Sequence, residues 1–159
     1  MTIVVEIPGP PQGKLRPRFT RKPIQTKSGV KYSFTPAATE AYEEEIRWRT
    51  ALMMRTYKQK LIEGMVVLHV EAFFRPPKKL TKAQYALAMS YRLYPTRPPD
   101  GDNIIKIIQD GLRKILIHED TQVVSTHCDK FYSEKPRVVF AVTQIGEDGL
   151  GGPTPRLGL

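Results

Sequence analysis

Runs of apolar and β-branched residues predict four strands along the chain. Residues 2–8, TIVVEIP, form a short β-branched run that ends in a turn rich in proline and glycine. Residues 65–74, MVVLHVEAFF, are apolar enough for a central strand, and the prolines after Arg75 stop it. Residues 121–132 and 137–145 predict two further strands, joined most simply as a hairpin.

Apolar residues spaced three and four apart predict helices between these strands. The longest begins at Thr35–Pro36, with the Thr35 hydroxyl as N-cap, and Gly64 closes it. A short helix is expected over residues 81–91, and a third helix follows from Asn103. The apolar positions of the three are, in order, Tyr42, Ile46, Met53, Tyr57 and Leu61; Leu80, Ala83 and Leu87; and Ile104, Ile105, Ile108, Leu112 and Ile115.

This order of elements predicts an α+β domain with a mixed sheet. With 159 residues and 40% hydrophobic residues, the chain is long enough for one core, expected over residues 1–145. Residues 146–159 have no periodicity and predict a disordered tail. The start of the chain lacks the basic region of a secretory signal, and no apolar run is long enough to span a membrane. A single cysteine, Cys128, excludes an internal disulfide and fits a cytoplasmic protein.

The net charge of +9 favours a polyanionic partner, and its distribution strengthens that expectation. Residues 1–35 hold seven Lys or Arg against one acid, with a hairpin expected to turn at residues 27–29. Residues 75–99 hold six Lys or Arg and no acid. The basic charge is therefore concentrated in two segments, and the second leads directly into Asp100.

Two carboxylates stand one residue apart where the third helix begins. Asp100 and Asp102 flank a glycine, and Asp102 is well placed as the helix N-cap. Two close carboxylates repel each other, so a cation between them would stabilise the pair. Oxygen ligands of this kind suit Mg²⁺, or Mn²⁺ in its place. The alternative is an ordinary helix cap with a solvated acidic neighbour.

Further charged residues favour the metal site over the simple cap. Lys106 lies one turn beyond Asp102, where it would reach a phosphate held by the metal. Glu119 and Asp120 follow a helix of about three turns, which would bring a third carboxylate back near Asp100. No rival site competes, because the adjacent His127 and Cys128 have the wrong spacing for zinc and no Gly-rich phosphate loop is present.

These motifs together resemble the RusA family of Holliday junction resolvases. The family shows D-x-D-N-x-x-K on a helix, D-x-L a turn later, and an acidic pair followed by x-Q-V-V. The matching residues here are Asp100, Asp102, Asn103, Lys106, Asp110, Leu112, Glu119, Asp120, Gln122, Val123 and Val124. Residues 8–19, PGPPQGKLRPRF, then Phe34-Thr35-Pro36 and Tyr42-Glu43, are similar to the phage and prophage branch. The resemblance covers residues 3–145, although residues 78–98 form a longer insertion than compact members carry.

The resemblance implies a RusA-like fold, with a long N-terminal helix and a second helix that carries the active-site motif. It implies a homodimeric, Mg²⁺-dependent endonuclease that cuts four-way DNA junctions in recombination and repair, in a bacterial or phage-infected cell. Asp100, Asp102 and Asp120 would hold the metal, and Lys106 would be the essential lysine beside it. The supporting positions would be Asn103, Asp110 and Glu119.

The basic residues of the N-terminal segment are expected to grip DNA phosphates. They are Lys14, Arg16, Arg18 and Arg21. Phosphate contacts carry no sequence information, and binding that depends on them weakens steeply with salt.

Three alternatives stay open at this point. The first is a nuclease for flaps, forks or recombination loops that shares the same metal site. The second is a non-catalytic junction-binding protein, which the basic segments support but the clustered acids oppose. The third is a glycosyltransferase-like D-x-D protein that uses Mn²⁺, for which the chain is too short.

Overall fold

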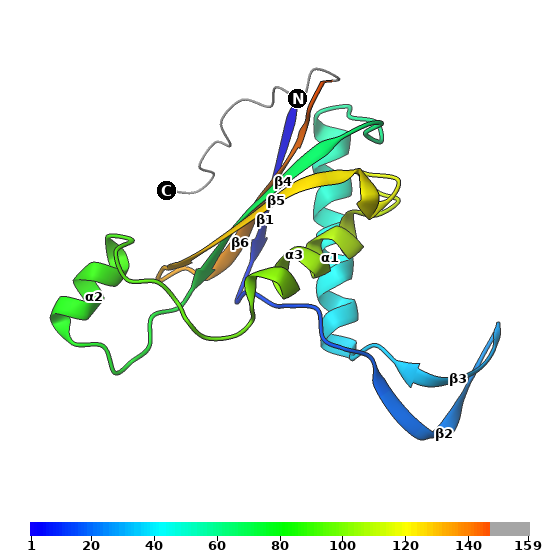
Figure 1. Ribbon diagram of the computed structural model, residues 1–159, viewed down its shortest axis with the longest axis horizontal. Helices are drawn as coiled ribbons and strands as arrows, with labels where there is room; N and C mark the ends of the chain where they lie inside the picture. Colours follow the sequence, from blue (N-terminus) through cyan, green and yellow to red (C-terminus); the bar gives the residue numbers. More distant parts are fainter. Residues whose placement is uncertain (147–159) are drawn as a thin grey trace.

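A mixed four-stranded sheet, with helices packed against it, forms the body of the protein (Figure 1). The structure is a computed structural model, and it describes residues 1–146. The predicted tail therefore lies, apart from Gly146, outside the described residues. In chain order the elements are β1 (Thr2–Pro8), β2 (Arg18–Thr26), β3 (Gly29–Phe34), α1 (Ala37–Thr56), β4 (Val66–Phe74), α2 (Lys82–Met89), α3 (Gly101–Leu112), the 3₁₀ turn η1 (Asp120–Gln122), β5 (Val123–Tyr132) and β6 (Arg137–Gln144).

The strand order in the sheet is β1-β6-β4-β5, which confirms the mixed sheet and corrects the predicted hairpin. β5 runs parallel to β4, and β6 runs antiparallel to both β4 and β1. β4 therefore lies between the two strands that were expected to pair. The reason is burial: eight of the nine β4 residues are buried, so the backbone N–H and C=O groups on both edges of this strand need hydrogen-bond partners. The parallel β4–β5 pair requires a crossover, and the segment that contains α3 provides it.

α1 is shorter than the spacing of apolar residues predicts. Pro36, not Thr35, occupies the N-cap position, and no side chain caps this end. The helix ends at Thr56, after which Lys58 adopts a left-handed conformation (φ 51°). Tyr57 is consequently 66% exposed, and it does not continue the buried stripe. Gly64 (φ +94°) instead forms the turn into β4.

The two later helices are present, with some differences in their buried faces. The Thr81 hydroxyl and the Gln84 side chain form a capping box at the start of α2. Ala88 is the buried residue of α2, whereas Leu87 is exposed. α3 buries Ile107, which the predicted face omitted, and Ile115 lies beyond its end.

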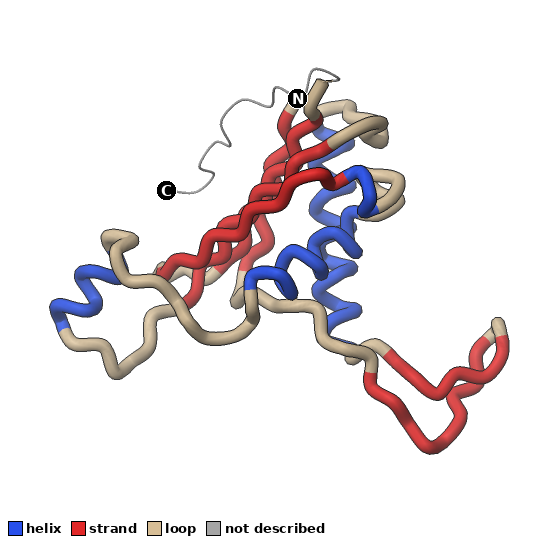
Figure 2. The backbone as a smooth tube through the Cα atoms, viewed as in Figure 1, coloured by secondary structure: helices blue, strands red, loops and turns tan. Residues whose placement is uncertain are grey.

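The core lies between the sheet and the two helices α1 and α3, which cross each other at an angle in the view of Figure 2. β1 alternates cleanly and points Ile3, Val5 and Ile7 into this core. α1 contributes Tyr42 and Ile46, and burial raises the pKa of the Tyr42 hydroxyl. No helix in residues 1–146 is both long and apolar enough to cross a membrane.

Candidate active site

The D-x-D motif lies at the first turn of α3, and the helix begins two residues earlier than predicted, at Gly101. Asp100 is the N-cap residue, with an extended backbone (φ −72°, ψ 153°), and Asp102 is the second residue of the helix. Neither carboxylate has a hydrogen-bond or ion-pair partner among residues 1–146, and both residues are exposed. The helix dipole stabilises negative charge at this end, which lets two acids stand close together. Two acidic side chains are thus left available to a cation.

The start of α3 packs against the middle of β5. A Cβ atom at Gly101 would lie 3.5 Å from both the Cβ and the Sγ of Cys128. Burial raises the pKa of the Cys128 thiol to about 11, and the neighbouring carboxylates of Asp129 and Asp102 add to the effect. This contact fixes the position of the helix end, and with it the D-x-D motif, on the sheet.

Lys106 lies four residues after Asp102, which places it on the same side of the helix. Its side chain is exposed and joins no ion pair within the described part of the chain. Lys106 is therefore free to meet an incoming anion beside the two carboxylates.

Asp120 lies at the opposite end of α3 from the D-x-D motif. The twelve residues of α3 span about 18 Å. The chain then passes through η1, whose first residue is Asp120, and enters β5 (Figure 1). The start of α3 instead touches Cys128, which lies five residues further along β5. Within residues 1–146 no three His, Cys, Asp or Glu side chains gather closely enough to hold a metal ion. A single chain therefore does not bring the third carboxylate to the first two.

Glu119 and Asp110, the other acids of the motif, already have partners. The Glu119 carboxylate accepts a hydrogen bond from Lys114 (2.5 Å), which lowers the pKa of Glu119. Asp110 lies 3.0 Å from the Lys14 ammonium group. Both acids are thus engaged within the chain.

Lys14 also forms an ion pair with Glu43 on α1, so it bridges two helices. Burial lowers the pKa of Lys14, but the hydrogen bonds to Glu43 and Asp110 outweigh it, and the net pKa is raised. The backbone N–H of Lys14 donates to the Asn103 carbonyl on α3 (2.9 Å). Tyr42-Glu43 also matches the sequence pattern of the family, but sequence reasoning assigned Glu43 no role at the site; the signal was an acid directly after Tyr42, on the buried stripe of the helix.

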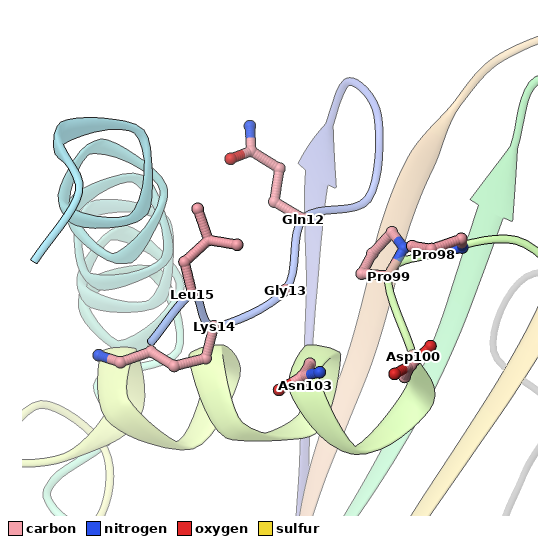
Figure 3. A pocket seen from close by; sticks show the side chains of 8 residues that line it. All are labelled: Gln12, Gly13, Lys14, Leu15, Pro98, Pro99, Asp100 and Asn103. Carbon is pink, nitrogen blue, oxygen red and sulfur yellow. The ribbon is translucent and has the colours of Figure 1, made fainter. Parts of the chain in front are cut away.

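A short extended segment, residues 9–17, crosses the start of α3, and we call it the strap (Figure 3). A Cβ atom at Gly13 would lie only 2.8 Å from the Cβ of Pro99 and 3.0 Å from that of Asn103. Glycine therefore permits this close approach. Between the strap and the helix lies a hollow of about 360 Å³, whose walls include Gln12, Leu15, Pro98, Pro99, Asp100 and Asn103.

The remaining predicted DNA-binding residues lie on or next to a projecting hairpin. β2 and β3 form this hairpin, residues 18–34, which we call the arm, and its turn confirms the one expected at residues 27–29. Arg16, at the end of the strap, is exposed, as are Arg18 and Arg21 on β2. Unlike Lys14, these three arginines have no partner within residues 1–146.

Comparison with known proteins identifies a family for this architecture. The chain matches the family described as endodeoxyribonuclease RusA over residues 8–143. It is also similar to the uncharacterized protein YqaN of Bacillus subtilis (strain 168), with 29% identity over 140 residues. That alignment covers 86% of this chain and 92% of YqaN.

Proposed function

Because the chain belongs to the RusA endodeoxyribonuclease family and is therefore a hydrolytic nuclease, we propose that it resolves four-way DNA junctions with Mg²⁺ held by Asp100 and Asp102. The observation that carries the proposal is the pair of unpartnered, exposed carboxylates at the start of α3. Mg²⁺ is usually bound through one or two carboxylates, water and phosphate oxygens, so this pair suits it.

The residues around the pair have complementary roles in the proposal. A bound Mg²⁺ would supply Lewis-acid activation of water and of the scissile phosphate. Lys106, one turn along the helix, would neutralise charge that develops on the phosphate. Asn103 has its backbone carbonyl engaged by the strap, and it would keep the hollow beside Asp100 in shape.

We further propose that Asp120 joins the site from a second copy of the chain. β5 is an edge strand, and its residues from Val124 to His127 are exposed. A second copy paired antiparallel along this edge would bring the start of one β5 toward the middle of the other. Gly101 packs at that middle position, against Cys128. A twofold dimer of this kind would also present two sites to two opposing strands of a junction.

Phosphate binding outside the site would fall to the free arginines Arg16, Arg18 and Arg21. Lys14, which is engaged by Glu43 and Asp110, would instead position the strap over α3. Each lost phosphate contact should reduce the slope of log binding constant against log salt concentration by about one.

The experiment is cleavage of a synthetic four-way junction, with and without Mg²⁺, by the wild type and by Asp102→Asn. We expect cleavage only by the wild type with Mg²⁺, whereas Asp102→Asn binds the junction nearly as well. Glu40→Gln, which removes an exposed acid at the start of α1, is the matched control and should cut normally. Loss of binding together with cutting in Asp102→Asn would contradict the metal role. Faster cutting of forks or flaps than of the junction would replace the proposed substrate.

A further inference from the structure

The arm is a separate structural unit without a core of its own. β2 and β3 form a two-stranded sheet that is not hydrogen-bonded to the main sheet. It projects away from the body in Figures 1 and 2, and none of its residues is buried. An isolated two-stranded hairpin is only marginally stable in water. Such an arm is therefore expected to gain order from a partner.

The arm exposes aromatic side chains on both faces. Phe19 is 85% exposed, Tyr32 56% and Phe34 43%. Phe19 pairs with Ser33, whereas Phe34 pairs with Arg18, so Phe19 and Phe34 lie on opposite faces. Three exposed aromatic side chains gathered on one projecting element indicate a contact surface.

The charge of the arm selects the kind of partner. Residues 18–34 contain five Lys or Arg and no acid, and Arg16 lies just before them. This combination of aromatic faces and cations is typical of proteins that bind nucleic acid with unstacked bases. An apolar protein partner would have to bury these cations without neutralising them, whereas the phosphates of DNA would neutralise them.

The base of the arm is fixed next to the D-x-D motif. The strap leads directly into β2, and its Lys14 N–H bonds to the Asn103 carbonyl on α3. Gly13 packs against Asn103 and Pro99. The arm is about nine residues long, or roughly 30 Å, which exceeds the reach of a side chain several-fold. It would therefore contact DNA well beyond the scissile phosphate.

We propose that Phe19 stacks on an unpaired or unstacked base at the branch point of the DNA substrate. This inference rests on the proposed function, and it assigns selection of branched over linear DNA to the arm. A continuous duplex keeps its base faces covered by neighbouring pairs, whereas a branch point exposes them. Arg18 and Arg21 bind phosphates of either substrate, and Phe19 distinguishes between the two.

The first test compares binding of a four-way junction and of a linear duplex in EDTA, so that cutting does not interfere. Phe19→Ala should weaken junction binding on the order of tenfold, the effect of losing one stacked base, and change duplex binding by less than about twofold. Phe19→Trp should bind both substrates as the wild type does. Tyr57→Ala, which removes an aromatic residue exposed outside the arm, is the matched control and should leave both unchanged.

The second test reports stacking directly through fluorescence. Trp48 is the only tryptophan of the chain, so Phe19→Trp in a Trp48→Phe background carries a single reporter. A junction should quench its emission, and a duplex of equal length should quench it much less. Circular dichroism melting of the variants checks that the fold is retained.

Several results would overturn the proposal. They are unchanged junction binding by Phe19→Ala, an equal loss on junction and duplex, equal quenching by both, and a change in oligomeric state of Phe19→Ala without DNA. Failure of the wild type to cut any branched DNA with Mg²⁺ would count against the proposed function instead, because the stacking tests need no cleavage.

Discussion

The acidic side chains at the two ends of α3 differ in whether they have partners within the chain. At the first turn, Asp100 and Asp102 stand close together without partners among residues 1–146. Beyond the last turn, Glu119 is neutralised by Lys114, and the Gln122 side chain ties the following turn to the Ile62 carbonyl. The acids at the first end are thus left to be completed from outside, whereas at the other end Glu119 is satisfied locally and the Asp120 carboxylate has no partner among residues 1–146. The comparison teaches that residues of one motif need not meet within one chain.

The largest effect is expected from mixing two inactive variants, which tests whether opposite ends of α3 from two chains form one site. Asp102→Asn and Asp120→Asn should each lower junction cutting by about 10²–10³-fold or more, by loss of positioned charge in the site. If Asp120 serves the partner's site, mixed dimers contain one complete site. Equal mixing, with exchange of subunits, should then restore about a quarter of the wild-type sites, measured as nicking of labelled junction.

The matched control for the mixing experiment uses two variants from the same end of α3. Asp100→Asn mixed with Asp102→Asn leaves every site of every dimer incomplete, so no activity should return. No recovery in the first mixture either would place all three carboxylates in one chain, and the contrast between the helix ends would be lost.

The next largest expected difference is in the alkylation rates of two cysteines, one near each end of α3. The pKa of Cys128 is raised to about 11, so little thiolate is present at pH 8.5. A cysteine placed at exposed Val124, in a Cys128→Ser background, should react with iodoacetamide on the order of a hundredfold faster. Because the raised pKa favours the neutral thiol, the stability from Cys128 is present below about pH 9 and lost as pH rises through 11. Equal alkylation rates at the two positions would show that the start of α3 does not cover Cys128.

The last turn of α3 should be more sensitive to added volume than its first turn. A Cβ atom at Gly111 would lie 2.6 Å from the Cγ2 of Ile46 on α1. Gly111→Ala should therefore lower the free energy of unfolding by about 1–3 kcal/mol, measured by urea denaturation. Gly101→Ala meets Cys128 at an ordinary 3.5 Å and should cost little or nothing. A larger loss in Gly101→Ala would reverse the comparison.

The smallest expected difference in stability is between substitutions of two lysines, Lys14 and Lys114. Lys14→Met leaves the half-buried Asp110 without its cation and the buried Glu43 with Arg47 alone, at 3.4 Å, and should cost about 1–2 kcal/mol at pH 7. Because the folded-state pKa of Lys14 is raised, its contribution is full below pH 10.5 and disappears as pH rises above that value. Lys114→Met breaks an exposed pair and should leave urea denaturation unchanged. If Lys14→Met also left urea denaturation unchanged, the strap would be held against α3 by its backbone alone.

Local sequence patterns predicted the elements but not their ends or partners. The alternation of Ile3, Val5 and Ile7 and the apolar run over residues 66–74 required strands, and both are present. The sequence did not predict that β5 and β6 are not neighbours in the sheet, because two strands joined by a short turn usually pair. Because β4 is buried, its backbone needs hydrogen-bond partners on both edges, and only this requirement reveals a second neighbour.

In the candidate site, too, sequence spacing predicted some relations between residues and not others. Asp100, Asp102 and Lys106 are neighbours on one helix turn, so sequence spacing alone relates them. The position of Asp120 depends on the direction of α3 against β5, which spacing does not encode. The engagement of Lys14 by Glu43 and Asp110 joins residues up to 96 positions apart in three elements, and no local pattern signals it.

β6 has a consequence for how the protein is made. It is the last strand of the described chain, yet it lies between β1, the first strand, and β4. On the ribosome, β1 has no neighbour in the sheet until residues 137–144 emerge. Long-range pairing of this kind slows folding, because loop closure precedes the contacts that reward it. A nascent chain would thus carry its basic arm and acidic helix end before a finished sheet holds them in place.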